Sequence, residues 1–265
     1  MSAPASDLPS ALAALDAILA RLRGRQTALF LDYDGTLTPI VERPEDALLS
    51  EGVRTLLGRL ARRWRVAIVS GRDRQVVERL VGLAGLAYVG SHGLDIAGPA
   101  GSGIHHQVAQ DFLPTLDAAE RALRARLTGV EGALVERKRF TVAAHYRRVA
   151  EHQRRAVAAA VDEVRGAHPR LRKESGKAVF ELRPDIDWDK GKAVLWLLDA
   201  LAPAQAVPVY VGDDLTDETA FTALAGSGIG VVVGAGSRPT AATFALGDPA
   251  EVLQFLGRLA TALEA

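Results

Sequence analysis

Four short polar stretches contain the residues whose types and spacing could carry out chemistry. Three of them come directly after short apolar runs, and the fourth opens a helical pattern. Carboxylates, hydroxyls and lysines are the groups that act as nucleophiles, proton donors and metal ligands in enzymes. The stretches are Asp32-Tyr33-Asp34-Gly35-Thr36, Ser70-Gly71-Arg72, Asp189-Lys190-Gly191-Lys192 and Gly212-Asp213-Asp214, the last followed closely by Asp217.

The apolar runs predict strands of a parallel sheet, because they lack the polar alternation of a half-exposed strand. Helical patterns separate them, so the sequence predicts an α/β fold with a Rossmann-like, doubly wound parallel sheet. In such a sheet ligands bind beyond the carboxyl ends of the strands, where the four stretches would meet. The runs lie at 28–31, 66–69, 207–211 and 229–233, and the helical patterns at 53–64, 75–83 and 192–201.

The middle of the chain has a different pattern. Strands with polar alternation and two helical segments predict a small α+β domain whose sheet has one solvent-exposed face. We predict that this domain is an insertion over 108–183. The core domain would then consist of 1–107 and 184–265, with an N-terminal helix inside 1–26.

The polar stretches together indicate phosphate chemistry. Asp32, Asp213 and Asp217 would repel one another unless a cation lay among them, and oxygen ligands without Cys or His favour Mg²⁺. Lys190 and Ser70 would neutralise or bind phosphate oxygens. Asp32 would be the nucleophile, and Asp34 the general acid and base. The predicted metal ligands are Asp32, Asp34, Asp213 and Asp217, with Asp214 as an alternative to the last.

Each stretch alone has a simpler explanation. Asp34-Gly35 could be a turn, Ser70 or Asp213-Asp214 a helix N-cap, and Lys190 a surface lysine. The occurrence of all four stretches at strand ends or a helix start favours the catalytic interpretation.

At these residues the chain resembles the haloacid dehalogenase (HAD) superfamily of phosphatases. Asp32 to Thr36, Ser70, Lys190 and Gly212 to Asp217 match its four motifs in order, and the insertion lies where larger members carry a cap domain. Finer matches resemble the trehalose-6-phosphate phosphatase family within it. The resemblance implies Mg²⁺-dependent hydrolysis of trehalose 6-phosphate through an aspartyl-phosphate. The finer matches include DYDGTLTP from Asp32, Ser91-His92-Gly93, His145-Tyr146-Arg147 and GDDLTDETAF from Gly212.

The insertion supplies polar side chains at strand spacing. Glu136 and Lys138 are two residues apart and so share a strand face, as do Lys177 and Glu181 at a spacing of four. Spacing alone also allows cross-strand ion pairs on a solvated face. The family resemblance implies instead that the insertion holds the sugar hydroxyls. The predicted substrate-binding residues are Arg72, Glu136, Lys138, Arg147, Lys177 and Glu181.

Composition limits the other classes of function. The 265 residues hold 32 basic and 32 acidic side chains, which argues against binding nucleic acid or membranes by bulk charge. There is no Cys, and no apolar run is long enough to span a membrane, so we expect a cytoplasmic enzyme. Its partners would be a small phosphosugar and possibly a separate trehalose-6-phosphate synthase. The alternatives are a related sucrose- or mannosyl-phosphate phosphatase, or a non-catalytic sugar-phosphate sensor.

Overall fold

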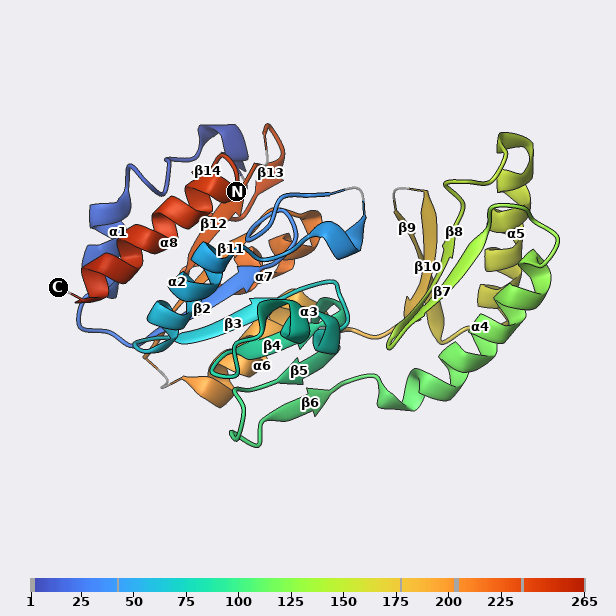
Figure 1. The fold of residues 1–265 in the computed structure, drawn as a ribbon, viewed down its shortest axis with the longest axis horizontal. Coiled ribbons are helices and arrows are strands. Elements are labelled where there is room, and N and C mark those ends of the chain that lie inside the picture. The colour runs from blue at the N-terminus through green and yellow to red at the C-terminus, as the bar shows by residue number, and fades with distance from the viewer. Residues whose placement is uncertain (1–2, 42, 177, 203–204, 235, 265) are drawn as a thin grey trace. The chain divides into compact units, whose positions relative to one another are not determined.

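A computed structural model describes residues 3–41, 43–176, 178–202, 205–234 and 236–264. The chain divides into two compact units (Figure 1). The first consists of 1–106 and 188–265, and the second is the continuous run 107–187. The second unit extends past the predicted end at 183 because its last strand runs to Pro184. The N–H of Asp185 then donates to the Arg170 carbonyl at 2.8 Å.

An eight-stranded sheet in the order β14-β12-β11-β2-β3-β4-β5-β6 forms the centre of the first unit. Strands β14 to β4 in that order are parallel, whereas β5 pairs antiparallel with β4. The predicted parallel sheet is confirmed, and the short edge strands lacked a readable pattern in the sequence. The strands are β2 (Thr27–Asp32), β3 (Arg65–Val69), β4 (Ala87–Gly90), β5 (Asp95–Ala97), β6 (His105–Gln107), β11 (Val207–Gly212), β12 (Ile229–Val233) and β14 (Phe244–Leu246).

Helices cover both faces of this sheet, which explains its unbroken apolar runs. Along β2, Leu29 and Leu31 belong to one apolar cluster, while Ala28 and Phe30 belong to another. The first cluster includes residues of α1 (Leu15–Leu22), α2 (Glu51–Ala61), α3 (Arg74–Val81) and α8 (Pro249–Glu264). The second includes residues of α6 (Lys190–Leu201) and α7 (Glu218–Ala223).

The second unit is a four-stranded antiparallel sheet with two helices, in the order β7-β8-β10-β9. Arg137 pairs with Asp117 of α4, and Lys173 pairs with Asp162 of α5, so these strand residues face the helices. Their neighbours along the strands therefore point to the opposite face. The elements are α4 (Leu113–Leu127), β7 (Leu134–Lys138), β8 (Thr141–His145), α5 (Glu151–Ala167), β9 (Leu171–Gly176) and β10 (Val179–Pro184).

Shorter elements complete the described chain. A two-stranded pairing joins β1 to β13. None of the described helices is long and apolar enough to cross a membrane. The remaining elements are β1 (Ala3–Pro4), β13 (Pro239–Thr240) and the 3₁₀ turns Ala5–Asp7, Pro44–Asp46, Ser91–Gly93, Gln110–Phe112 and Leu215–Asp217.

Candidate active site

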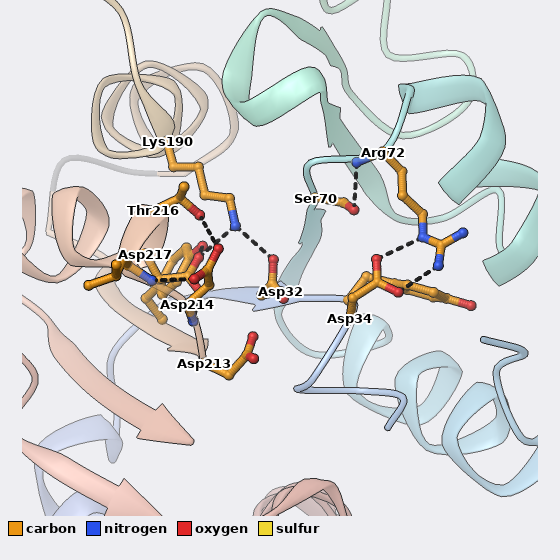
Figure 2. A network of polar contacts seen from close by, with 12 residues as sticks. Asp32, Asp34, Ser70, Arg72, Lys190, Asp213, Asp214, Thr216 and Asp217 are labelled. Carbon is orange, nitrogen blue, oxygen red and sulfur yellow. Dashed lines mark hydrogen bonds and ion pairs between the residues drawn. The ribbon is translucent and has the colours of Figure 1, made fainter. Parts of the chain in front are cut away.

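The carboxyl ends of β2 and β11 carry the centre of the site (Figure 2). Asp32 is the last residue of β2, and Asp213 follows β11 directly. Because these strands are parallel neighbours, their ends lie side by side. Lys190 reaches them from the first position of α6, where the Asp189 side chain caps the helix by accepting from the Lys192 N–H at 2.9 Å.

Lys190 joins two of the carboxylates in the interior. Its Nζ donates to Asp32 Oδ1 at 2.8 Å and to Asp217 Oδ1 at 2.7 Å, and all three side chains are buried. Asp217 also accepts from the Tyr210 hydroxyl at 2.6 Å and from the Asp214 N–H at 2.9 Å. Protein donors thus contact both oxygens of Asp217. Sequence reasoning missed Tyr210, although a tyrosine in a buried strand needs a partner for its hydroxyl.

The cluster carries more negative than positive charge. Oxygens of Asp32, Asp213 and Asp217 lie within 4.8 Å of one another, against the single ammonium of Lys190. Burial raises the pKa of Asp32 well above its usual range, although Lys190 opposes the rise. Burial and the neighbouring carboxylates Asp217 and Asp214 raise the pKa of Asp213 to about 6. Burial lowers the pKa of Lys190, but Asp32 and Asp217 outweigh it, so that the net shift is upward.

The donor set fits a divalent cation. A charge of +2 would balance three carboxylates and one ammonium, and Mg²⁺ prefers oxygen ligands. Asp213 Oδ1 is buried and has no hydrogen-bond partner among the described residues. Gly35 leaves the necessary space, since a Cβ there would lie 2.1 Å from Asp213 Oδ2, and its φ of +83° favours glycine.

Asp34 lies apart from this cluster and pairs with Arg72. The Arg72 guanidinium donates to Asp34 Oδ2 at 2.7 Å from Nε and to Oδ1 at 2.6 Å from Nη2. The chain turns after β2, where the Gly35 N–H donates to the Thr38 carbonyl. The Asp34 carboxylate therefore has an arginine partner and lies outside the group of side-chain oxygens formed by Asp32, Asp213 and Asp217. Arg72, predicted to bind substrate, likewise has a carboxylate partner in the same chain.

A constrained turn supports the Ser70–Arg72 loop. Ser91 and His92 both adopt positive φ, at 51° and 55°, which is unusual for residues other than glycine. Their N–H groups donate to the carbonyls of Arg72 and Ser70 at 2.7 and 3.1 Å. Ser70 Oγ accepts from the Arg72 N–H at 3.1 Å. These bonds fix the backbone of the loop, so that Arg72 approaches Asp34 from a defined position.

In the second unit, three of the predicted sugar-binding residues share the sheet face opposite the helices. Lys138 Nζ donates to Glu181 Oε1 at 3.3 Å, and Glu136 and Glu181 both lie opposite Ala143 in the register. His145 Nε2 lies 2.8 Å from Glu136 Oε2, and this hydrogen bond lowers the pKa of Glu136. Arg147 is exposed after β8. Lys177 lies outside the described residues.

Comparison with known proteins decides the family. The family model described as trehalose-phosphatase matches residues 30–250. The chain belongs to the trehalose-phosphatase family. This chain is therefore a phosphatase by family, and the predicted resemblance is confirmed.

Individual members of this family match the sequence over nearly the whole chain. Trehalose 6-phosphate phosphatase RA3 of Zea mays is 44% identical, over 95% of this chain and 74% of its own length. The trehalose-phosphate phosphatase of Mycobacterium tuberculosis is 47% identical, over 97% of this chain and 67% of its own. Among solved structures, the C. albicans trehalose-6-phosphate phosphatase C-terminal domain is 28% identical with a TM-score of 0.77, covering 96% and 99% of the two chains.

A more distant neighbour extends the fold assignment. A haloacid dehalogenase-like hydrolase from B. subtilis has a TM-score of 0.56 at 18% identity, covering 88% of this chain and 100% of that chain. This likeness shows the fold alone and confirms the predicted HAD fold.

Proposed function

We propose that this trehalose-phosphatase hydrolyses trehalose 6-phosphate to trehalose and phosphate, in a Mg²⁺-dependent reaction through phosphorylated Asp32. The observation that carries the proposal is the buried cluster of Asp32, Lys190, Asp213 and Asp217 in a chain of this family. Asp32 stands at the end of the central strand, with one oxygen held by Lys190.

In the first step an Asp32 oxygen attacks the phosphorus atom. The bond from phosphorus to the sugar oxygen breaks, and its electron pair stays on that oxygen, which takes a proton from Asp34. Lys190 orients Asp32 by holding Oδ1, and its charge opposes the rise in the Asp32 pKa that burial causes. Ser70 would donate to a phosphate oxygen once its hydroxyl proton turns toward the substrate.

In the second step a water molecule attacks the phosphorus atom of the aspartyl-phosphate. Asp34, now ionised, takes the proton of the water, and the bond from phosphorus to Asp32 breaks. This step releases phosphate and restores the Asp32 carboxylate. Asp34 thus acts in both steps. When its carboxyl group is protonated, it must give up at least one of its two hydrogen bonds to Arg72.

Asp32 and Asp213 would hold the cation, with Asp217 beside them. When bound, Mg²⁺ neutralises carboxylate and phosphate charge, which lets the two anions approach each other. Burial raises the pKa of both Asp32 and Asp213, and the positive charge of the protein does not offset this rise, which supports a cation between them.

We propose further that the second unit reads the sugar. Carboxylates and a lysine on one sheet face suit sugar hydroxyls, and Glu136, Lys138 and Glu181 lie there together. Arg147 and Lys177 complete the proposed set. A sucrose- or mannosyl-phosphate phosphatase would use the same core chemistry. A non-catalytic sensor would not need both Asp32 and Asp34.

The setting proposed for the reaction follows from its substrate. A separate trehalose-6-phosphate synthase would supply the substrate. We propose a cytoplasmic location, with which the absence of Cys is consistent.

Phosphate release from a panel of phosphosugars, with and without Mg²⁺, tests the proposal. We expect trehalose 6-phosphate to be preferred and Ca²⁺ to fail in place of Mg²⁺, because Ca²⁺ takes longer bonds and more ligands. Asp32→Asn should lack turnover, whereas Asp199→Asn, an exposed carboxylate on α6, should be unaffected. Full activity after chelation, or in Asp32→Asn, would contradict the mechanism.

A further inference from the structure

A residue outside the four sequence motifs contacts the proposed cation site. Arg238 lies in the segment between β12 and β13, and its Nη2 donates to the backbone carbonyl of Asp213 at 2.9 Å. The same Nη2 lies 3.7 Å from Glu218 Oε1, at the first position of α7. The side chain is 24% exposed, so most of it is packed inside the first unit.

The N-terminal segment fixes Arg238 from the other side. β1 pairs antiparallel with β13, with Pro4 opposite Pro239. The N–H of Ala5 donates to the Arg238 carbonyl at 2.9 Å. The backbone of Arg238 is therefore held by the N-terminal segment while its guanidinium holds Asp213.

A second bond fixes the loop relative to α7. The N–H of Ala241 donates to Glu218 Oε2 at 2.9 Å. Glu218 follows Asp217, so the loop around Arg238 is tied to the segment that carries both Asp213 and Asp217. These contacts restrict the backbone position of Asp213 and hence the position of its Cα–Cβ bond.

We propose that Arg238 is a positioning residue of the cation site, which fixes the Asp213 peptide so that its carboxylate is presented to Mg²⁺. The inference rests on the proposed metal site. Asp213 Oδ1 is buried without a partner among the described residues, so the side chain gains its orientation chiefly from its backbone and from the space at Gly35. Partners behind metal ligands commonly contribute a factor of about 10 to 100 in metal affinity.

The two physical effects of Arg238 on Mg²⁺ have opposite signs. Its positive charge disfavours a nearby cation, so removal of the charge alone would tighten binding. Removal of the positioning bond would weaken binding, since Asp213 could adopt other orientations. The direction of the change therefore separates a positioning role from a merely electrostatic one.

The test is the Mg²⁺ dissociation constant of the full chain, measured by titration calorimetry at fixed pH and salt. We expect about 10- to 100-fold weaker binding for Arg238→Gln. Arg238→Lys keeps the charge and one donor but loses the planar fork, and should lie between wild type and Arg238→Gln. The matched control is Arg258→Gln, since Arg258 also donates to a backbone carbonyl, that of Leu12 at 3.3 Å, on an exposed surface.

The outcomes separate the inference from the proposed function. Unchanged or tighter binding in Arg238→Gln would overturn the positioning role while leaving the metal site intact. A wild-type chain that binds no Mg²⁺ would overturn the metal site and this inference with it. Thermal unfolding without metal checks that each variant is folded. If Arg238→Gln is unfolded, the inference depends on Arg238→Lys, and wild-type affinity in that variant would overturn it.

Discussion

At the scale of single residues, the partner of Asp34 controls how this carboxylate can act. Arg72 contacts both of its oxygens, while Asp34 remains 39% exposed. The bonds of the Ser70–Arg72 loop to Ser91 and His92 fix the arginine backbone. Asp34 is thus the more exposed member of the pair, and Arg72 fixes the orientation of its carboxylate before substrate binds.

Arg72→Lys should lower kcat on trehalose 6-phosphate more than on p-nitrophenyl phosphate. Lysine keeps the positive charge but cannot form the two parallel hydrogen bonds to Asp34. The nitrophenolate leaving group needs little help from a general acid, whereas the sugar oxygen needs a proton. Steady-state kinetics on both substrates measures the difference. A rise in KM alone, for the sugar phosphate only, would instead indicate that Arg72 binds substrate directly.

Stabilisation by Mg²⁺ should decrease as the pH falls through about 6, the raised pKa of Asp213. Below that pH the cation must displace a proton from Asp213. Without metal the sign is reversed: the folded chain holds this proton more tightly than the unfolded chain, whose pKa is near 3.8. This carboxyl therefore lowers the stability of the metal-free protein as pH rises from about 4 to 6.

Thermal unfolding from about pH 4 to 7.5, with and without Mg²⁺, measures both effects. Asp213→Asn is the control, because it lacks the titrating group and should show neither the metal effect nor this contribution to the pH dependence. The same profile in wild type and variant would assign the titration to another group.

Sequence could predict the centre of this site but not its surroundings. Asp32 and Asp213 end neighbouring parallel strands, and Lys190 opens a helix, so the fold alone brings them together. The pairing of Asp34 with Arg72, and the contact of Arg238 with Asp213, depend on loops whose paths no periodicity defines. The partners in these contacts are 38 and 25 residues apart in the chain.

At the scale of elements, a close approach of α6 to α7 positions Lys190. A Cβ on Gly191 would lie 2.3 Å from the Thr219 carbonyl oxygen, and the Gly191 N–H donates to Thr219 Oγ1 at 3.1 Å. Glycine at this position lets the first turn of α6 contact the chain that follows Asp217. The N-terminal turn of α6 is therefore held in place, and from it Lys190 reaches the carboxylates of Asp32 and Asp217.

Gly191→Ala should destabilise the protein by about 1–3 kcal/mol and lower kcat, because the added methyl group separates α6 from α7 and moves Lys190. Denaturant unfolding and kinetics measure the two effects. Gly58→Ala is the matched control: a Cβ there meets nothing within 4 Å, inside α2. This substitution should stabilise by about 0.5–1 kcal/mol. Equal effects of both substitutions would contradict the packing argument.

At the scale of the whole molecule, the division of the chain into two units predicts a division of labour. The proposed acid–base and nucleophilic groups belong to the first unit, and the proposed sugar-binding groups belong to the second. Binding energy far from the reacting phosphate can still raise kcat, because it positions the substrate.

Glu181→Ala should reduce kcat/KM on trehalose 6-phosphate severely, by roughly 10²-fold or more, if Glu181 binds sugar hydroxyls that help to position the substrate. Its effect on p-nitrophenyl phosphate should be small, since that substrate has no sugar. Glu163→Ala, which removes an exposed carboxylate paired with Arg126 on the helical side of the same unit, is the control. Equal proportional losses on both substrates would show that Glu181 supports structure instead of specificity.

The insertion of one unit into the other also predicts an order of folding. The 107–187 unit is a continuous run, whereas Asp32 and Lys190 meet across 158 residues, and β2 pairs with β11 only after the whole insertion has been synthesised. Contacts between residues that are close in the chain form faster than distant ones. β2 also pairs with β3, and β11 with β12, over short stretches of chain, so the order concerns the bonds between β2 and β11. During refolding, we therefore expect the amides that pair β8 with β10 to become protected from hydrogen exchange before those that pair β2 with β11. Pulse labelling with hydrogen exchange would reveal this order. The proposed catalytic centre should be among the last parts of the protein to form.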